Sequence, residues 1–415
     1  MTSTVAGWVG RRRLLALVGA SLALSAVAFS IDSGASHTAA AAASGSLTCK
    51  NGHILIGIDK AQSGPASFFD TAGTQGMLVA IADINAAGGI HGCKISTINM
   101  DDQSNPATGA QVATEEIAKG IQVLVVGDDF DSGIAAAQAG AKAGLLVLSL
   151  AASSTEFGTA VGPTMFNGGI DTTVLGNDAA TYSLTRGWKK MFEVLDPSLS
   201  YFTLQDTSFR HAYKGGAVVG TDINKSYEGA TADFSTTISK IQATKPSVIY
   251  ALLTYPAVGS FVKQLRAAGI NTPVIGDVTI DTRDFPALTG TAATKNVYYV
   301  TQVFWVGSGT SVGVSPAMVK FDKEYKTMFG KFPEQANAPE AYQVFYAIAD
   351  ALKQKGVTDA LSAAKAIKAE HNLAVPGGKL LAWYKGYAVW NGTIVGFTPS
   401  GGFRKITVIP SKPNE

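Results

Sequence analysis

The residues best placed to do chemistry lie in short loops that follow predicted strands. These loops are rich in Ser, Thr, Gly and Asp and comprise residues 59–69, 101–105, 127–132, 151–155, 196–201, 254–256 and 277–281. In an open parallel sheet, ligands bind beyond the carboxyl ends of the strands. The free N–H groups of a helix that begins there favour an anion such as a carboxylate. The pattern therefore predicts a binding site for a small polar solute.

Five side chains in these loops are candidates for ligand contacts. Phe69 and Tyr201 can provide apolar walls from two halves of the chain, and Asp277 can pair with an ammonium group. Ser132 and Ser153 can anchor a ligand through their hydroxyl groups. Four of them have a structural alternative. The serines are equally typical of helix N-caps, Phe69 of loop packing and Asp277 of the start of a turn.

No catalytic signature accompanies these loops. The histidines are scattered, and none has the spacing of a metal site: His37, His53, His91, His211 and His371. Phosphate-binding, zinc-protease and dinucleotide-binding motifs are missing from the sequence. We therefore expect no catalysis, no metal and no cofactor, and we keep an enzyme on a dinucleotide-binding type of sheet as a minor alternative.

A strand, a helix and a second strand open the folded part of the chain. The first strand is the apolar run Ile54–Ile58, which is too short for a buried helix. The helix carries apolar residues three or four apart between Met77 and Ile84, and Gly88-Gly89 ends it. The strand Lys94–Met100 follows. This order predicts a βαβ unit with a right-handed crossover and a parallel sheet.

The same rhythm continues, breaks across residues 162–171 and then resumes. Strands are expected at 123–126, 145–148, 191–195, 248–253, 274–276 and 297–304, and helical regions at 200–219, 257–268, 316–329, 338–354 and 358–370. Short β-like runs fill the tail from Gly377 to Ile409. Repeated βα units predict an α/β fold with two doubly wound parallel-sheet lobes.

Composition limits the classes of partner. Of the 415 residues, 46% are hydrophobic and only 15% are charged, so the chain can bury a sizeable core and is not a disordered chain. Residues 45–415 carry 30 basic and 30 acidic residues. A segment without net charge has no general attraction for a phosphate backbone or an acidic membrane surface. We therefore expect no nucleic-acid partner.

The N-terminal segment has the order of a signal peptide. Three arginines, Arg11-Arg12-Arg13, precede an apolar run that ends at Ala28, and small residues follow. We place the signal peptide at 1–28, with cleavage as late as about residue 44, and a linker at 29–48. The arginines also admit the twin-arginine route. We expect an exported protein of the cell envelope, the periplasmic space or the extracellular space, with an uncleaved membrane anchor as the alternative.

Two cysteines, Cys49 and Cys93, each stand just before a predicted strand of the opening unit. In an exported protein this arrangement favours a structural disulfide. The alternative is a lipid-anchored Cys49, although Ser46-Leu47-Thr48 lacks the small residue that such a site needs before the cysteine.

The opening unit resembles the type I periplasmic binding proteins, specifically the leucine/isoleucine/valine-binding branch that serves ABC transporters. The matching residues include Ser63-Gly64-Pro65, Ile84-Asn85-Ala86-Ala87-Gly88-Gly89-Ile90-His91-Gly92, Asp101-Asp102, Asn105-Pro106 and Val126-Gly127. The likeness is strong over residues 52–160, moderate over 240–355 and weak elsewhere.

The resemblance implies how the two lobes are assembled. Three crossovers near residues 165, 302 and 373 would form the hinge. Lobe I would comprise residues 49–164 plus 303–372, and lobe II residues 165–302 plus 373–415. A solute would bind in the cleft between the lobes, which closes around it.

The resemblance also implies ligand contacts. In lobe I, Phe69 and Ala152-Ser153-Ser154 match contact positions, and Asp131 or Ser132 matches the serine that binds the ligand's carboxylate. Ser153 stands where a threonine holds the same carboxylate. In lobe II, Tyr201 matches the aromatic cover, and the acid that holds the ammonium aligns between Asp277 and Val278. The acids Asp128, Asp129 and Asp131 depart from the pattern, and they would repel an anion unless they point away.

The family implies an exported solute-binding protein of an ABC importer. It would capture an amino acid or a related small polar or aromatic solute, such as an amide or a carboxylate. It would deliver this solute to an ABC permease, act as a monomer and catalyse no reaction. An extracellular ligand-sensing receptor on the same fold is the alternative.

Overall fold

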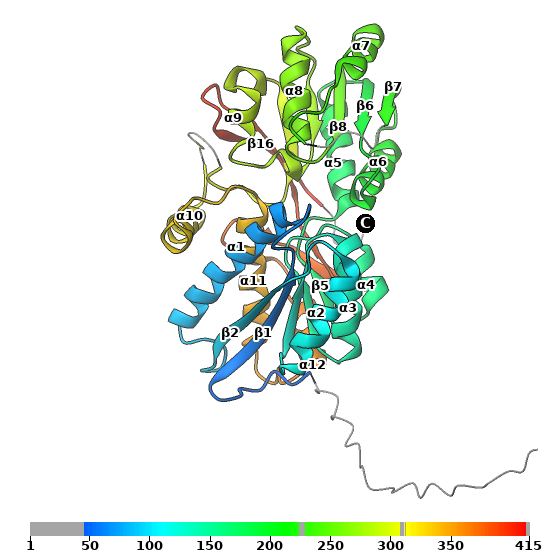
Figure 1. The fold of residues 1–415 in the computed structure, drawn as a ribbon. Coiled ribbons are helices and arrows are strands. Elements are labelled where there is room, and N and C mark those ends of the chain that lie inside the picture. Colours follow the sequence, from blue (N-terminus) through cyan, green and yellow to red (C-terminus); the bar gives the residue numbers. More distant parts are fainter. Residues whose placement is uncertain (1–44, 224–228, 308–310, 312, 412–415) are drawn as a thin grey trace, which may run out of the picture. The chain divides into compact units, whose positions relative to one another are not determined.

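The computed structural model describes residues 45–223, 229–307, 311 and 313–411. The predicted signal peptide and most of the predicted linker therefore lie outside the described residues. Two mostly parallel sheets of seven strands form the fold, and helices flank both of them (Figure 1). This arrangement confirms the predicted fold class.

The first sheet has the strand order β13-β14-β5-β4-β3-β1-β2. Its strands are β1 (His53–Lys60), β2 (Lys94–Asp101), β3 (Val123–Val126), β4 (Leu146–Ser149), β5 (Met165–Asn167), β13 (Ala382–Tyr384) and β14 (Tyr387–Val389). The helices of this lobe are α1 (Ser67–Ala86), α2 (Pro106–Ala118), α3 (Phe130–Lys142), α4 (Glu156–Val161), α10 (Pro316–Phe329), α11 (Asn337–Leu352) and α12 (Ala360–Lys368). A small separate hairpin consists of β11 (Leu373–Val375) and β12 (Gly378–Leu380).

The apolar run of β3 is continuous because both faces of this sheet are covered. Val123 and Val125 share one core with residues of α1, α11 and α12. Leu124 and Val126 share a second core with residues of α2, α3 and α4. Successive side chains of a strand point to opposite faces. A buried parallel strand therefore has no polar face, which explains why its sequence lacks alternation.

The second sheet has the strand order β16-β15-β10-β9-β8-β6-β7. Its strands are β6 (Lys190–Leu195), β7 (Ala217–Ile223), β8 (Val248–Leu252), β9 (Val274–Gly276), β10 (Val297–Thr301), β15 (Gly392–Phe397) and β16 (Phe403–Ile409). The helices of this lobe are α5 (Thr172–Thr185), α6 (Ser200–Ala212), α7 (Ser235–Thr244), α8 (Ala257–Ala267) and α9 (Phe285–Thr289), with 3-10 turns η1 (Val278–Ile280) and η2 (Thr291–Thr294).

The helical region expected at residues 200–219 is too long. The helix α6 ends at Ala212, and the strand β7 begins at Ala217. Most residues of β7 are exposed or half-buried, because it is the edge strand of its sheet. An edge strand lacks the apolar run by which buried strands are recognised. The helices α5 and α7 were not predicted, since their sequences show weak apolar periodicity.

Three segments pass between the two sheets, and they meet at one carbonyl. The first passage follows β5, the second follows β10, and the third joins β14 to β15. The Gly168 carbonyl accepts hydrogen bonds from Gln302 Nε2 at 3.2 Å and from Trp390 Nε1 at 2.8 Å. One residue from each passage thus takes part. The third passage was expected near 373 but lies at residues 390–391, because β13 and β14 still belong to the first sheet.

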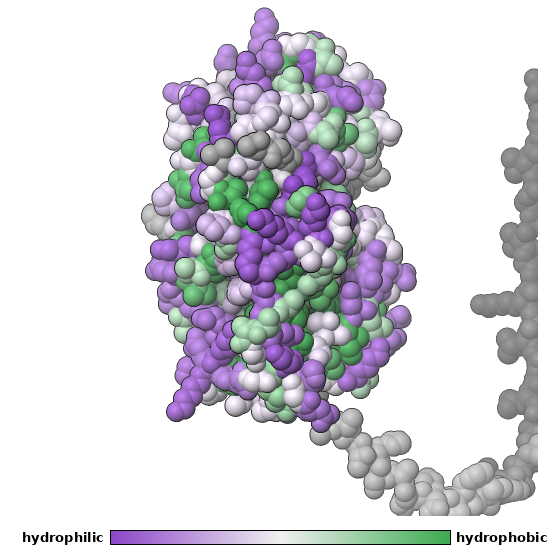
Figure 2. Space-filling model, turned by 90° about the vertical axis from the view of Figure 1, so that its left-hand side faces the viewer, coloured by the Kyte–Doolittle hydropathy of each residue, from purple (hydrophilic) through white to green (hydrophobic). Residues whose placement is uncertain are grey.

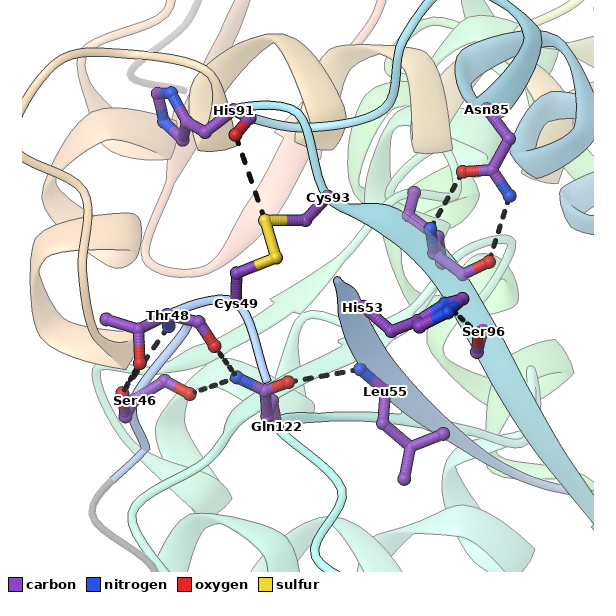
Figure 3. The surroundings of a disulfide bond; sticks show 11 residues. Ser46, Thr48, Cys49, His53, Leu55, Asn85, His91, Cys93, Ser96 and Gln122 are labelled. Atoms are coloured by element: carbon purple, nitrogen blue, oxygen red, sulfur yellow. Dashed lines mark hydrogen bonds between the residues drawn. A yellow bond between two sulfur atoms is a disulfide. The ribbon is translucent and has the colours of Figure 1, made fainter. Parts of the chain in front are cut away.

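A disulfide joins Cys49 to Cys93, with 5.8 Å between their Cα atoms (Figure 3). This confirms the predicted disulfide. Beside it, Gln122 donates to the carbonyls of Ser46 and Thr48, both at 2.7 Å. The end of the predicted linker is therefore packed against the first lobe, where Leu47 is buried.

No helix in the described part of the chain is long and apolar enough to cross a membrane. Figure 2 shows one face of the molecule, where hydrophilic residues cover much of the surface and hydrophobic ones form small groups. Among the described residues, the exposed large hydrophobic side chains include Phe68, Met328 and Phe332.

Candidate functional site

The strand order of each sheet contains a switch point, where the chain passes from one side of a strand to the other. In the first sheet, β1 lies between β2 and β3, so the chain reverses direction around β1. In the second sheet, β6 lies in the same way between β7 and β8. The carboxyl ends of strands at such a switch point are the usual ligand sites of open α/β sheets. Phe69, Asp131, Ser132 and Tyr201 follow these strands, whereas Ala152, Ser153 and Ser154 follow β4 and Asp277 follows β9.

A buried ion cluster occupies the switch point of the first sheet. Lys60, the last residue of β1, pairs with Asp128 just after β3 and with Asp70 of α1, at 3.3 Å in the latter case. All three side chains are almost completely buried. Burial lowers the pKa of Lys60, but the two carboxylates outweigh it and raise this pKa overall. Asp128 Oδ1 also accepts from Ser149 Oγ at 3.2 Å and from Ala151 N at 3.1 Å. The cluster is therefore largely satisfied within the protein.

The three acids that depart from the family pattern all point at protein partners. Asp128 faces Lys60, and Asp129 is the N-cap of α3, where it accepts from Ser132 N at 3.0 Å. Asp131 Oδ2 accepts from Ser200 Oγ of α6 at 3.2 Å. Asp131 thus joins the two lobes. The expected N-cap role of Ser132 is wrong, since Asp129 has that role and Ser132 is the third residue of the helix.

The loop after β4 holds the predicted anchors in different environments. The Ala152 carbonyl accepts from Gly169 N at 2.9 Å, next to the first interlobe passage. Ser154 Oγ accepts from Glu156 N at 3.1 Å, as a helix-capping group does. Ser153 is 8% exposed, and its hydroxyl makes no hydrogen bond within the described residues. Of these serines, Ser153 is therefore the one whose hydroxyl is available to a ligand.

The predicted residues of the second lobe come together in the structure. Asp277 Oδ2 accepts from Gln205 Nε2 at 2.7 Å, and Asp277 Oδ1 accepts from Thr279 N at 2.9 Å, so Asp277 caps η1. Burial raises the pKa of Asp277, while its hydrogen bonds lower it. Tyr201 lies one helical turn before Gln205, and its buried hydroxyl makes no hydrogen bond of good geometry. Burial, followed by the nearby Asp277 carboxylate, raises the pKa of Tyr201.

A neighbour of Phe69 makes the aromatic contact between the lobes. Phe68 of α1 stacks on Tyr255 of the second lobe, with ring centroids 5.2 Å apart and 12° between the planes. Phe69 is half-buried and makes no ring contact in the described part of the chain. The contact of Phe69 with a ligand stays a prediction, and the sequence gave no means to tell which of the two adjacent phenylalanines stacks on the second lobe.

Two buried acids of the interlobe region were not among the predicted contacts. Glu340 lies in the first turn of α11, and Asp281 ends η1. The two elements are tied together, because Ala336 N donates to the Asp281 carbonyl at 3.1 Å and Glu340 N donates to the Ala336 carbonyl at 2.9 Å. Burial, then repulsion from Asp281 and Asp128, raises the pKa of Glu340. No sequence signal could reveal it, since an acid in the first turn of a helix is ordinary.

Several buried polar atoms of this region have no hydrogen-bond partner among the described residues. They are Glu340 Oε1, Asp281 Oδ2, Gln205 Oε1 and the Tyr201 hydroxyl. A buried polar atom without a partner costs about 1–3 kcal/mol. Such atoms are therefore expected to meet a ligand or water. No group of three or more His, Cys, Asp or Glu side chains in the described ranges is arranged to hold a metal ion.

Comparison with characterised proteins finds relatives among amino-acid-binding proteins. The chain is 27% identical over 230 residues to the Leu/Ile/Val-binding protein of Escherichia coli (strain K12), which covers 54% of this chain and 60% of that protein. It is 25% identical over 340 residues to Leu/Ile/Val-binding protein homolog 1 of Brucella abortus (strain 2308). This match covers 76% of this chain and 82% of that protein. The first match thus spans less than two thirds of the relative.

Solved structures show the same fold. The substrate-binding protein of a branched-chain amino acid transporter from Streptococcus pneumoniae, solved with isoleucine, has a TM-score of 0.73 at 22% identity and covers 85% of this chain and 99% of its own. A solute-binding protein of an ABC transporter from R. palustris, solved with 4-hydroxybenzoate, has a TM-score of 0.74 at 17% identity, with coverage of 87% and 98%.

The sequence model of one family spans most of the chain. It is described as "Periplasmic binding protein" and matches residues 53–384, which include both switch points and the first two passages between the sheets. The chain therefore belongs to the periplasmic binding protein family.

Proposed function

We propose that this protein is the exported solute-binding component of an ABC importer and captures a small polar solute between its two lobes. The solute would be an amino acid or a related amide or carboxylate. The observation that carries the proposal is a set of buried polar atoms where the lobes meet. Among them are Glu340 Oε1 of the first lobe and the Tyr201 hydroxyl of the second, which have no hydrogen-bond partner within the described residues. The relatives named above bind branched-chain amino acids or 4-hydroxybenzoate, which supports this class of solute.

Binding in this proposal involves no catalysis. The ligand stabilises a closed arrangement because it contacts both lobes at once. The Asp131–Ser200 hydrogen bond and the Phe68–Tyr255 stack are contacts that closure would bring together. The partner of the loaded protein would be an ABC permease. We also propose that the protein acts as a monomer and is exported, with its leader either cleaved or kept as an anchor.

A thermal-shift screen of the purified protein tests this proposal. The panel should contain amino acids, amides and aromatic acids. A ligand that binds only the folded state raises the midpoint temperature of unfolding. At a ligand concentration of a hundred times the dissociation constant, it adds about 2.7 kcal/mol to the free energy of unfolding. We expect at least one member of the panel to give such a shift. If none does, the importer proposal loses its main support.

A further inference from the structure

The unpartnered atoms between the lobes are mainly hydrogen-bond acceptors. In its ionised form a carboxylate oxygen can only accept, and Gln205 is oriented with its Nε2 toward Asp277, so its Oε1 can also only accept. Glu340 Oε1 and Asp281 Oδ2 are likewise unpartnered, and both residues are at most 2% exposed. A ligand that satisfies these atoms must donate hydrogen bonds. An anion could not do so.

Glu340 and Asp281 are close enough to repel each other, and neither forms an ion pair within the described residues. Asp281 Oδ1 accepts from Tyr299 Oη and Trp305 Nε1, which leaves Oδ2 without a partner. The electrostatic neighbours that act on Glu340 are Asp281 of the second lobe and Asp128 of the first. Lys60 is already engaged by Asp128 and Asp70. Arg283, two residues after Asp281, is paired with Asp322 at 2.7 Å. Lys60 and Arg283, the positively charged residues named here, are therefore paired with carboxylates other than Glu340 and Asp281.

Asp277 does not fill the role of ammonium holder on its own. Both of its oxygens accept hydrogen bonds from Gln205 and Thr279. Glu340 and Asp281 each keep one oxygen without a partner. Glu340 and Asp281 together can carry two negative charges. The ammonium of a neutral amino acid would balance only one of them, and the carboxylate of the same ligand would add another negative charge. A buried charge is tolerated when it is paired.

We propose that the solute of this site carries a net positive charge and that its amine or guanidinium group binds between Glu340 of the first lobe and Asp281 of the second. The inference rests on the proposed function and narrows it to cationic solutes, such as basic amino acids and polyamines. The Ser153 hydroxyl remains available to a polar group at the other end of the solute.

Isothermal titration of the purified protein with seven probes tests this inference. The cationic probes are arginine, lysine, agmatine and putrescine, and the others are leucine, benzoate and acetamide. We expect at least one cationic probe to bind about tenfold or more tightly than the other three, and Glu340→Gln to weaken its binding by about tenfold or more. Asp281→Asn should weaken the same probe as an independent test if the first variant fails to fold.

Glu116→Gln is the matched control. Glu116 is also completely buried, has one unpartnered oxygen and has a pKa raised to about 7 by burial, but it lies on α2 and accepts from Ile58 N. Its replacement should leave affinity for the cationic probe within about twofold, because the group is not between the lobes. Equal losses in both variants would show a general effect of removing a buried acid and would overturn the inference.

The pH dependence of binding to the unmodified protein provides a second measurement. The pKa of Glu340 is raised, so a cation that binds its ionised form must displace a proton. Burial also raises the pKa of Asp281 to about 7. Affinity for the cationic probe should therefore rise as the pH increases through that value, with proton release on binding. Affinity that stays flat or falls as the pH increases would contradict the inference.

The outcomes separate this inference from the proposed function. If leucine, benzoate or acetamide binds and the cationic probes do not, the protein is a solute-binding protein but the net-charge inference is wrong. If none of the seven probes binds, both are overturned. Binding of a cationic probe that Glu340→Gln and Asp281→Asn leave unchanged would support the proposed function and reject the cation subsite.

Discussion

The two halves of the interlobe site treat their buried charges in opposite ways. On the first lobe, Lys60 pairs with both Asp70 and Asp128, and neighbouring amides and a hydroxyl donate further hydrogen bonds to the two acids. On the other side, where η1 meets α11, Asp281 and Glu340 each keep an unpartnered oxygen. The first half is therefore organised before any ligand binds. In our proposal, the second half is completed by the cationic group of the solute. We therefore expect substitutions in the first half to affect stability most and substitutions in the second half to affect ligand affinity most.

The largest expected effect tests the organised half. Lys60→Met should lower the free energy of unfolding by about 3–5 kcal/mol, because it leaves two carboxylates buried without their cation. Urea denaturation measures this. Lys331→Met is the control: its pair with Glu334 is exposed, so the loss should stay below about 1 kcal/mol. If Lys60→Met lowers the free energy of unfolding as little as the control does, Lys60 does not stabilise the two buried carboxylates.

The pH dependence of stability tests the incomplete half. Burial raises the pKa of Asp281 from 3.8 to about 7. The folded state therefore binds a proton that the unfolded state has lost, so the contribution of Asp281 is fully present below about pH 4 and is lost as the pH rises toward 7. Relative to Asp281→Asn, the ligand-free protein should lose up to about 1.4 kcal/mol per pH unit over this range.

Chemical denaturation of both proteins at several pH values measures that difference. Other buried acids with raised pKa values, such as Glu116 and Asp178, contribute equally to both proteins and cancel in the comparison. Parallel stability curves for the two proteins would mean that Asp281 is ionised in the folded state and would contradict its raised pKa.

Removal of the Ser153 hydroxyl should affect binding and not folding. Ser153→Ala should weaken binding of the best ligand by about 1–3 kcal/mol if the hydroxyl is an anchor. Stability should change by less than about 0.5 kcal/mol, since the hydroxyl makes no hydrogen bond within the described residues. Unchanged affinity, measured by calorimetry, would remove Ser153 from the site.

The smallest expected effect concerns the contact between the lobes. A double-mutant cycle with Phe68→Ala and Tyr255→Ala should give a coupling of about 0.5–1.5 kcal/mol in the stability of the ligand-bound protein. The coupling should shrink without ligand if the lobes then separate. Additive effects in the ligand-bound protein would mean that the stack is not a contact of the closed state.

The fold could largely be predicted from the sequence, because buried parallel strands and the helices between them leave strong local patterns. The run of β3 and the glycines after α1 are examples. What escaped prediction lacks such a pattern. The strand β7 is an exposed edge, and the passage at residues 390–391 depends on which sheet accepts β14, a pairing made far away in the sequence.

The predicted ligand contacts remain a prediction, but the structure shows which of them have partners within the protein. Tyr201, Asp131 and Ser153 all lie just beyond the carboxyl ends of strands, as the resemblance implied. The resemblance could not show that Asp131 accepts a hydrogen bond from Ser200, because that bond joins the two lobes. Nor could it select Glu340, which stands far from every predicted loop in the sequence. Pairing of buried charges is a property of the three-dimensional arrangement alone.

A crystal structure of the protein with its best-binding probe tests the central claim most directly. We predict a ligand between the lobes, with a nitrogen at about 3 Å from Glu340 and Asp281 and a polar group near the Ser153 hydroxyl. A ligand found elsewhere, or a bound ligand that leaves both carboxyl groups without a partner, would contradict the account.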